Sequence, residues 1–267
     1  VDPLLMAPGV DERRAAEAIL DAALAESDAA GAGFTILQDR LPPTGPLADA
    51  LRARGFSELR TLPTAVLEHE FDSFEEYVDG LRSKYRSRTR RILRQSRHLR
   101  VERVEEFSAL APEFSALWRL VHERATETKR EVLAEPFFTR AAALPETAAL
   151  VLRRADGSMA AFGLLLQDAP SLHFLQCGFA LEAGRQEAAY FRLVLEVVRA
   201  GIDGGFRSIN LGCTTLAPKL ATGAVAMPLH AWIRHRNPLM NLGCQAVARR
   251  SRSEPTPAPH AVFATRA

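Results

Sequence analysis

Three short apolar runs separated by turn residues constrain the fold of this chain more than any other feature. Residues 148–181 read AALVLRRADGSMAAFGLLLQDAPSLHFLQCGFAL. Asp156-Gly157 lies between the first and second runs, and residues 168–171 lie between the second and third. Both connections have the composition of tight turns. Strands joined by turns this short must be antiparallel neighbours. We therefore predict an antiparallel three-strand meander in this region.

Helical and strand patterns surround the meander in a definite order. An amphipathic helix is predicted before it, over residues 107–127, with four apolar positions on one face: Phe114, Leu117, Trp118 and Val121. The segments after it are predicted as an apolar helix over 185–206, a short buried strand over 207–212, a short helix over 214–224 and a last strand over 225–236. This order predicts a mixed α+β fold, in which a mostly antiparallel sheet is flanked by helices.

The first part of the chain alternates helical and strand patterns. The predicted elements are a helix over 11–30, a strand over 33–39, a short helix over 45–56 and a strand over 58–70. At the other end, the Arg-, Ser- and Pro-rich tail has too little apolar area to order itself. We expect four parts: a partial N-terminal unit (1–72), a basic linking helix (73–100), a C-terminal unit (101–241) and a disordered tail (242–267).

Composition excludes some classes of function. The formal net charge of the 267 residues is only +2, and no apolar run reaches the roughly 20 residues that span a bilayer. Cys177, Cys213 and Cys244 lie far apart with no CxxC pair or histidine cluster, so neither a metal site nor a disulfide framework is predicted. We expect a cytoplasmic protein with no membrane partner and no tightly bound cofactor. Because the chain begins with Val1, we also expect it to be part of a longer chain.

One segment departs from this balance. Ser73 and Glu76 match a capping box, and the helix that they start continues into LRSKYRSRTRRILRQSRHLR, where nine Arg and Lys residues occur without an acid. A solvated face is the plain interpretation of such a run. Without acids between them, however, like charges at helical spacing repel one another and call for an anion. A phosphate backbone would provide it, with Lys84, Arg88, Arg91 and Arg94 as the contacts. The face opposite is too polar for a membrane surface.

The order of elements around the meander resembles the GNAT N-acyltransferase fold. That resemblance implies two strands that separate just before the apolar helix, and a helix start that binds the phosphates of an acyl donor. The corresponding loop here reads FALEAGRQEAAY. The resemblance therefore implies a donor-binding role for Gly184, Arg185, Gln186, Glu187 and Ala188. The loop departs from the usual pattern. In that pattern an arginine or glutamine is followed by two glycines or small residues, whereas this sequence offers Arg185 and then, after two longer residues, Ala188 and Ala189.

The basic segment and the segment KLATGA together resemble the Fem-type (FemABX-like) and BioF2-like acetyltransferases. These proteins carry two GNAT-like units in tandem, a basic K-Y-R-x-x-x-R-R helix before the second unit, and a K-x-x-x-G-A segment near its end. Here the latter is Lys219, Gly223 and Ala224. The resemblance covers about residues 3–241 and implies that the first unit is incomplete. It also places Lys219 near the donor, where it would stabilise the leaving group.

The resemblance implies an acyltransferase that joins an acyl or aminoacyl group to an amine. The donor would be acyl-coenzyme A or aminoacyl-tRNA as a co-substrate, and the acceptor an amine-bearing small molecule or peptide. Further catalytic candidates are His173 in a strand and Glu123, with His122, near the end of a helix. Each has a plainer interpretation as a packed or surface side chain. The alternative function is a non-catalytic binding or scaffold unit of a larger biosynthetic enzyme.

Overall fold

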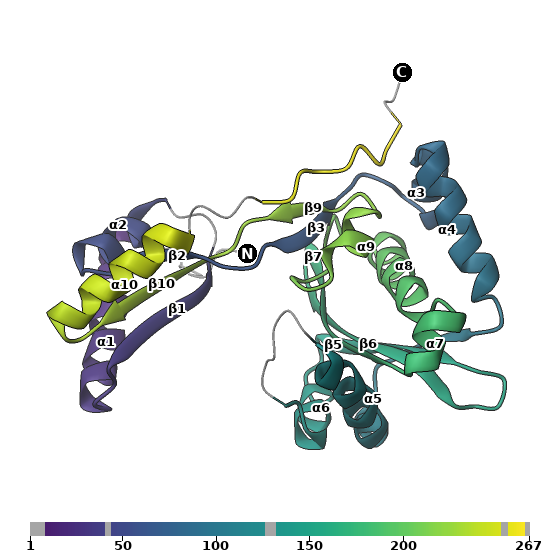
Figure 1. The fold of residues 1–267 in the computed structure, drawn as a ribbon, viewed down its shortest axis with the longest axis horizontal. Helices are drawn as coiled ribbons and strands as arrows, with labels where there is room; N and C mark the ends of the chain where they lie inside the picture. Colours follow the sequence, from purple (N-terminus) through teal and green to yellow (C-terminus); the bar gives the residue numbers. More distant parts are fainter. Residues whose placement is uncertain (1–8, 41–43, 126–131, 252–255, 265–267) are drawn as a thin grey trace. The chain divides into compact units, whose positions relative to one another are not determined.

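We describe the fold from a computed structural model, which defines residues 9–40, 44–125, 132–251 and 256–264. The chain divides into two compact units (Figure 1). Unit 1 combines residues 1–63 with 227–257, and unit 2 combines residues 64–226 with 258–267. The predicted mixed α+β class is confirmed. The unit boundaries differ from the expected ones, because the segment after residue 226 returns to the N-terminal part of the chain.

Unit 1 is an antiparallel sheet of three strands in the order β1-β10-β2, counted within the described ranges. Its elements are α1 (Glu12–Ala29), β1 (Phe34–Arg40), α2 (Pro46–Ala53), β2 (Ser57–Arg60), β10 (His230–His235) and α10 (Pro238–Ser251). The strand expected to close the C-terminal unit is therefore the middle strand of this sheet. Trp232 on β10 explains the placement, because it fills a core formed with Leu20, Leu51 and Phe56.

The expectation of a disordered tail from residue 242 was wrong for most of its length. Helix α10 begins at Asn237, whose side chain accepts the N–H of Leu239 at 2.9 Å, and it packs on β2 and β10. Cys244 and Ala248 are buried one helical turn apart. The Arg- and Ser-rich composition hid this apolar pair, which is sufficient to order the helix against the sheet.

Unit 2 contains a seven-stranded sheet in the order β4-β5-β6-β7-β8-β3-β9, again within the described ranges. The strands are β3 (Thr64–Glu68), β4 (Arg100–Val104), β5 (Thr147–Arg153), β6 (Met159–Asp168), β7 (Ser171–Phe179), β8 (Ser208–Asn210) and β9 (Val225–Met227). The predicted meander is confirmed as β5-β6-β7, with both turns as expected. Strand β8 pairs in parallel with β7.

Helices cover both faces of this sheet. They are α3 (Phe74–Gly80), α4 (Ser83–Gln95), α5 (Ala111–Arg124), α6 (Glu135–Ala141), α7 (Leu181–Gln186), α8 (Ala189–Asp203), α9 (Leu216–Leu220) and the 3-10 turn η1 (Ser108–Leu110). Alternate residues of β5 face different cores: Leu150 and Leu152 pack in the core with α3 and α8, whereas Ala149 and Val151 pack in the core with α5 and α6. The period of two thus specifies a sheet buried on both faces.

The basic segment forms two helices rather than the single helix predicted. Ser73 does start the first of them, since its hydroxyl accepts the N–H of Glu76 at 3.1 Å. The helix ends at Gly80, and Leu81 is extended, with ψ at 142°. Leu81 forms an isolated antiparallel bridge with Phe263, so a distant segment of the chain takes up the backbone groups that would otherwise continue the helix.

Candidate active site

Strands β7 and β8 separate after three residue pairs. The last pair is His173 with Asn210, although β7 continues to Phe179. The cause is an irregularity in the pairing of β7 with β6, where Leu164 faces Gln176 and Leu165 faces Phe174, so that Leu175 is an extra residue. Such a bulge bends its strand. Beyond His173 the two strands therefore enclose a wedge, as the family resemblance implies.

The side chain of Lys219 points into this wedge. A Cβ atom built on Gly212, just after β8, would lie 3.4 Å from the carbonyl oxygen of Phe174 on β7 and 3.5 Å from Nζ of Lys219. The amine is thus next to the backbone where the strands diverge. Helix α9 brings it there: the chain passes through Gly212 at φ 81° and Thr215 at φ 52°, two left-handed positions that reverse its direction before the helix starts.

Lys219 is a buried cation without an acidic partner. The residue is 3% exposed, and no carboxylate pairs with its Nζ atom in the described part of the chain. Burial lowers its pKa, and the nearby thiols of Cys177 and Cys213 oppose this only in part. A buried charge of this kind is costly unless something else compensates it. The site is therefore suited to a negatively charged ligand or transition state.

Two further side chains line this wedge. Burial raises the pKa of the Cys177 thiol to about 11, despite the neighbouring Lys219, so Cys177 is a neutral thiol near pH 7 and not a nucleophile. Tyr190, in the first turn of α8, is hydrogen-bonded to the side chain of Thr215, and its burial raises the pKa of its hydroxyl. It therefore remains a protonated phenol that can donate a hydrogen bond. Sequence reasoning missed Tyr190 because it reads as one of the apolar positions of its helix.

The predicted donor loop is partly helical. Gly184, Arg185 and Gln186 lie in α7, and their side chains are outside the described set. Ala188 is left-handed, with φ at 54°, and no side chain caps the N-terminus of α8. Ala188 and Ala189 are both buried. The backbone at the start of this 15-residue helix thus retains N–H groups that no side chain of the helix itself satisfies.

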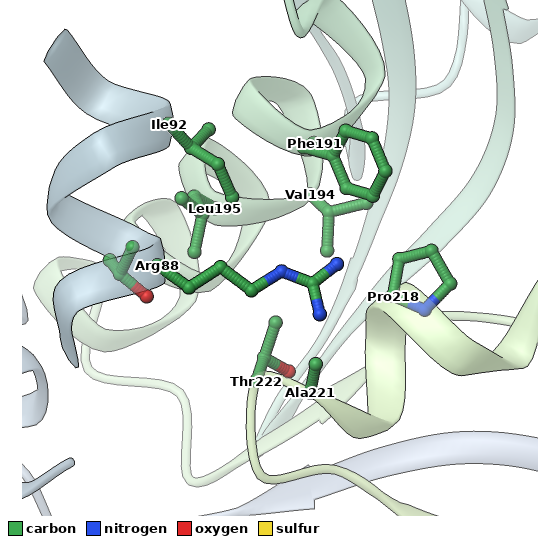
Figure 2. Close-up of a pocket in the computed structure, with 9 residues that line it drawn as sticks. Arg88, Ile92, Phe191, Val194, Leu195, Pro218, Ala221 and Thr222 are labelled. Atoms are coloured by element: carbon green, nitrogen blue, oxygen red, sulfur yellow. The ribbon is translucent and has the colours of Figure 1, made fainter. Parts of the chain in front are cut away.

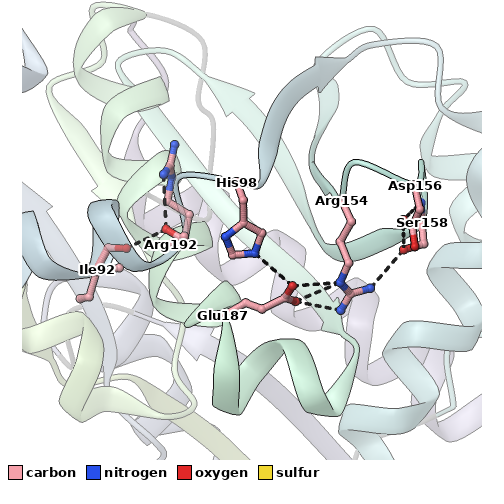
Figure 3. Close-up of polar contacts among 8 residues, drawn as sticks. Ile92, His98, Arg154, Asp156, Ser158, Glu187 and Arg192 are labelled. Carbon is pink, nitrogen blue, oxygen red and sulfur yellow. Dashed lines mark hydrogen bonds and ion pairs between the residues drawn. The ribbon is translucent and has the colours of Figure 1, made fainter.

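The carboxylate of Glu187 is bound by the side chains of Arg154 and His98 (Figure 3). Arg154, after β5, donates to Oε2 through Nε at 3.0 Å and through a terminal nitrogen at 2.8 Å. His98, after α4, lies 3.1 Å from Oε1. Hydrogen bonds from Arg154 lower the pKa of Glu187, so the carboxylate is ionised at neutral pH. The loop predicted to bind an anion already carries one.

The remaining catalytic candidates lie apart from Lys219. His173 stands at the narrow end of the wedge, with Nε2 3.9 Å from the Asp168 carboxylate, and burial lowers its pKa. Glu123 is exposed near the end of α5, and no contact in the described residues joins it to the wedge. His122 stacks on Trp118 with ring centroids 4.7 Å apart. Their catalytic roles remain predictions.

The cations of α4 fall into two groups. Arg86 and Arg90 bind Asp79, through its backbone oxygen and its carboxylate respectively. The predicted contacts Lys84, Arg91 and Arg94 have no acidic partner among the described residues, and neither does Arg88. The segment therefore keeps a set of uncompensated cations after folding, as the absence of acids in its sequence predicts.

Arg88 connects this helix to the helix of Lys219. Its guanidinium lies over the Phe191 ring, 5.5 Å from the centroid, in a small pocket between α4, α8 and α9 (Figure 2). The pocket has a cavity volume of about 20 Å³ and includes Pro218, the residue before Lys219. The guanidinium of Arg88 therefore lies beside the helix that carries Lys219.

Two further features of the described residues bear on function. No cluster of three or more His, Cys, Asp or Glu side chains there could hold a metal ion. The helices that the structure defines include none with the length and apolarity that crossing a membrane requires.

Residues 80–219 match the family model described as an acetyltransferase (GNAT) domain. The chain belongs to this family. The match extends from Gly80, the last residue of α3, to Lys219, so it includes α4, the wedge and both strands that form it. Family membership places the chain among the acyltransferases as a class. Curated proteins provide no significant match to the sequence.

Solved structures share the fold at low sequence identity. FemX is similar with a TM-score of 0.62 at 14% identity, covering 88% of this chain and 81% of FemX. The C-terminal domain of a putative lysylphosphatidylglycerol synthetase from Agrobacterium fabrum gives 0.60 at 18% identity, covering 85% of this chain and 75% of that one. L-PGS from Bacillus licheniformis gives 0.57 at 13%, covering 89% and 79%. The resemblance to a Fem-type GNAT fold is therefore confirmed.

The buried charge of Lys219 predicts a stability effect that depends on pH. In the unfolded chain the amine has a pKa of about 10.4, whereas burial lowers it in the folded protein. Unfolding therefore takes up a proton between the two pKa values, so this destabilising contribution is full below the folded pKa and disappears as pH rises to the unfolded one. Lys219→Met should raise the free energy of unfolding at pH 7 by on the order of 1 to 3 kcal/mol. Denaturant melts at several pH values should show this gain shrinking towards pH 10.

Lys84→Met is the matched control, because Lys84 is exposed on α4. It should alter stability little at any of these pH values. A Lys219→Met variant that is less stable than the wild type at pH 7 would contradict the view that the amine is an uncompensated charge.

Proposed function

We propose that this chain forms an amide bond by transferring an acyl or aminoacyl group to an amine. The observation that carries the proposal is Lys219, a buried amine without an acidic partner beside the point where β7 and β8 diverge. The Lys219 cation would stabilise any transition state that develops negative charge in the wedge. Acyl transfer to an amine does so twice, first on the carbonyl oxygen and then on the leaving group.

The reaction can be written with the groups that the wedge contains. The neutral amine of the acceptor attacks the carbonyl carbon of the donor and forms the C–N bond. The nitrogen then loses a proton while the C–O bond of an aminoacyl ester, or the C–S bond of a thioester, breaks, and the departing oxygen or sulfur takes up a proton. Lys219 and Tyr190 are two proton-bearing groups near this point. The lowered pKa of Lys219 brings its proton within easier reach of a basic leaving group, and the amine can then take up the proton that the nitrogen loses. The acceptor proposed is an amine-bearing small molecule or peptide.

Two features favour an aminoacyl-tRNA donor. The uncompensated cations of α4 present a surface for a phosphate backbone, and Arg88 extends it towards α9. Glu187 already neutralises Arg154 next to the start of α8, where the pyrophosphate of a coenzyme A thioester would otherwise bind. One of the similar structures is named as a putative lysylphosphatidylglycerol synthetase, and a lysyl group is an aminoacyl group. Acyl-coenzyme A remains the second candidate, because the family model is that of an acetyltransferase domain.

A thermal-shift screen with acyl-coenzyme A thioesters and charged tRNAs tests the proposal directly. A true donor should raise the melting temperature. At a hundredfold excess over its Kd, the bound donor adds about 2.7 kcal/mol to the free energy of unfolding. Turnover of that donor should then fall by about 100-fold or more in Lys219→Ala, the usual effect of removing one stabilising group of this kind. Protection by neither class would instead favour a non-catalytic scaffold unit.

The salt dependence of tRNA binding distinguishes two cases: either α4 contacts the phosphates of tRNA, or its charged face is only solvated. Arg91→Ala should weaken tRNA binding and lower the slope of log K against log salt concentration by about 1 if Arg91 contacts one phosphate. Arg90→Ala is the matched control on the same helix, since its guanidinium is already paired with Asp79. Filter binding between about 50 and 200 mM salt measures both slopes. Equal slopes for wild type and Arg91→Ala would show that α4 does not grip the donor.

Glu187 provides a test of the choice between donors. Glu187→Gln removes the negative charge at the start of α8 while keeping the size of the side chain. It should tighten the binding of coenzyme A by about fivefold, because a like charge at contact distance costs on the order of 1 kcal/mol even when well screened. Glu182→Gln, on the exposed side of α7, is the control. Calorimetric titration that finds no gain for Glu187→Gln would exclude a blocking role of this carboxylate.

A further inference from the structure

The segment of residues 258–264, which we call the C-terminal strap, packs along the junction between α3 and α4. The backbone N–H of Arg82 donates to the carbonyl oxygen of Val262 at 2.9 Å, and that of Ala264 donates to Gly80 at 3.0 Å. Nε of Arg82 donates to the carbonyl oxygen of Phe263 at 3.0 Å. Val262 is 1% exposed. These bonds fix a strap that is separated by almost two hundred residues from its partners in the sequence.

Phe263 of the strap packs on the end of the K-x-x-x-G-A segment. A Cβ atom at Gly223 would lie only 2.4 Å from the Phe263 ring, so the ring is seated directly on the glycine backbone. The ring also lies against Phe71 and Tyr77, at centroid distances of 5.4 and 6.0 Å. Gly223 has φ at 99°. Both its conformation and this close approach require a glycine, which gives the position a physical reason beyond the sequence pattern.

A continuous set of contacts joins this packing to Lys219. The hydroxyl of Tyr77 donates to the carbonyl oxygen of Thr222 at 2.8 Å. The hydroxyl of Thr222 donates to the carbonyl oxygen of Lys219 at 2.7 Å, and the Thr222 N–H donates to the same oxygen at 3.0 Å. The segment that follows Lys219 is therefore held by Tyr77 at Thr222 and by Phe263 at Gly223.

Helix α9 depends on such external support. It has five residues and begins at a left-handed Thr215 with no side-chain cap, whereas isolated helices below about 12 residues are marginal in water. The desolvation of Lys219 opposes its burial. An amine in this position would turn towards water unless the following segment held the helix against the sheet.

We propose that the C-terminal strap holds Lys219 in the wedge, with Phe263 as the positioning residue that acts through Gly223 and Thr222. The proposal concerns the placement of the amine, and it gives the strap a part in catalysis only if the acyl transfer proposed above is correct. Without the Phe263 ring, α9 and its lysine lose the contact that keeps them packed against the wedge. The amine would then become accessible to solvent while the sheet remains folded.

Competitive labelling of the full chain with acetic anhydride, read by mass spectrometry across a pH series, reports the accessibility of each lysine amine. In Phe263→Ala, labelling of Lys219 should rise at least tenfold, and its pH profile should move up to that of an exposed lysine such as Lys84. Cys177 and Cys213 face the amine in the wild type, and their contribution is lost as it leaves the wedge. Phe263→Tyr, which keeps the ring, should restore the wild-type profile.

Two further variants separate positioning from general loss of stability. Phe138→Leu disturbs the core formed with α5 and α6, so it should lower the melting temperature without changing the Lys219 profile. Gly223→Ala displaces the same ring from the other side and should reproduce the Phe263→Ala profile, which keeps the test decisive if Phe263→Ala does not fold. A Lys219 profile unchanged in whichever of these two folds would overturn the proposal. Full turnover in Lys219→Ala would refute the proposed mechanism and leave the labelling result intact.

Discussion

The site depends on the bulge at Leu175. A regular β7 would continue its pairing with β8 beyond His173 and close the space that now receives Lys219. The extra residue bends β7 while its pairing with β6 resumes at Gln176, so the strand leaves one neighbour without losing the other. One inserted residue therefore creates an opening inside an otherwise continuous sheet, and the meander on the other side preserves the rigidity of the site.

The wedge concentrates charge that the fold does not neutralise. Elsewhere in unit 2, cations near the sheet are paired: Arg192 binds Glu196 at 2.6 Å, and Arg154 binds Glu187. Lys219 and the unpaired group on α4 differ from these, although Arg86 and Arg90 of the same helix are satisfied by Asp79. An acidic side chain therefore does lie on this surface, and the cations without an acidic partner lie along α4 and at the wedge. This distribution fits a polyanionic donor better than a face adapted only to water.

The meander, the apolar helix and the role of Ser73 could be predicted because each follows from local rules of spacing, turns and capping. The place of β10 could not be predicted, because the sequence around Trp232 does not show which unit's core this side chain fills. Only its packing with Leu51 and Phe56 decides that. The break at Leu81 and the order of the strap likewise arise from pairing between residues 81 and 263. Sequence patterns report such long-range pairing poorly, because neither partner has an unusual local composition.

The site residues divide in the same way. Lys219 was accessible to prediction because a family motif names it, whereas Tyr190, Arg154 and Phe263 act through contacts with residues far away in the sequence. Glu187 is the most instructive case. As a loop residue it was expected to offer its amide to a ligand, yet its side chain binds Arg154 and His98. A carboxylate at this position weakens the electrostatic attraction for pyrophosphate that a helix start normally provides. Under the proposed function, the unpaired cations of α4, which meets α9 at the pocket lined by Arg88, are a second source of attraction for a phosphate-bearing donor.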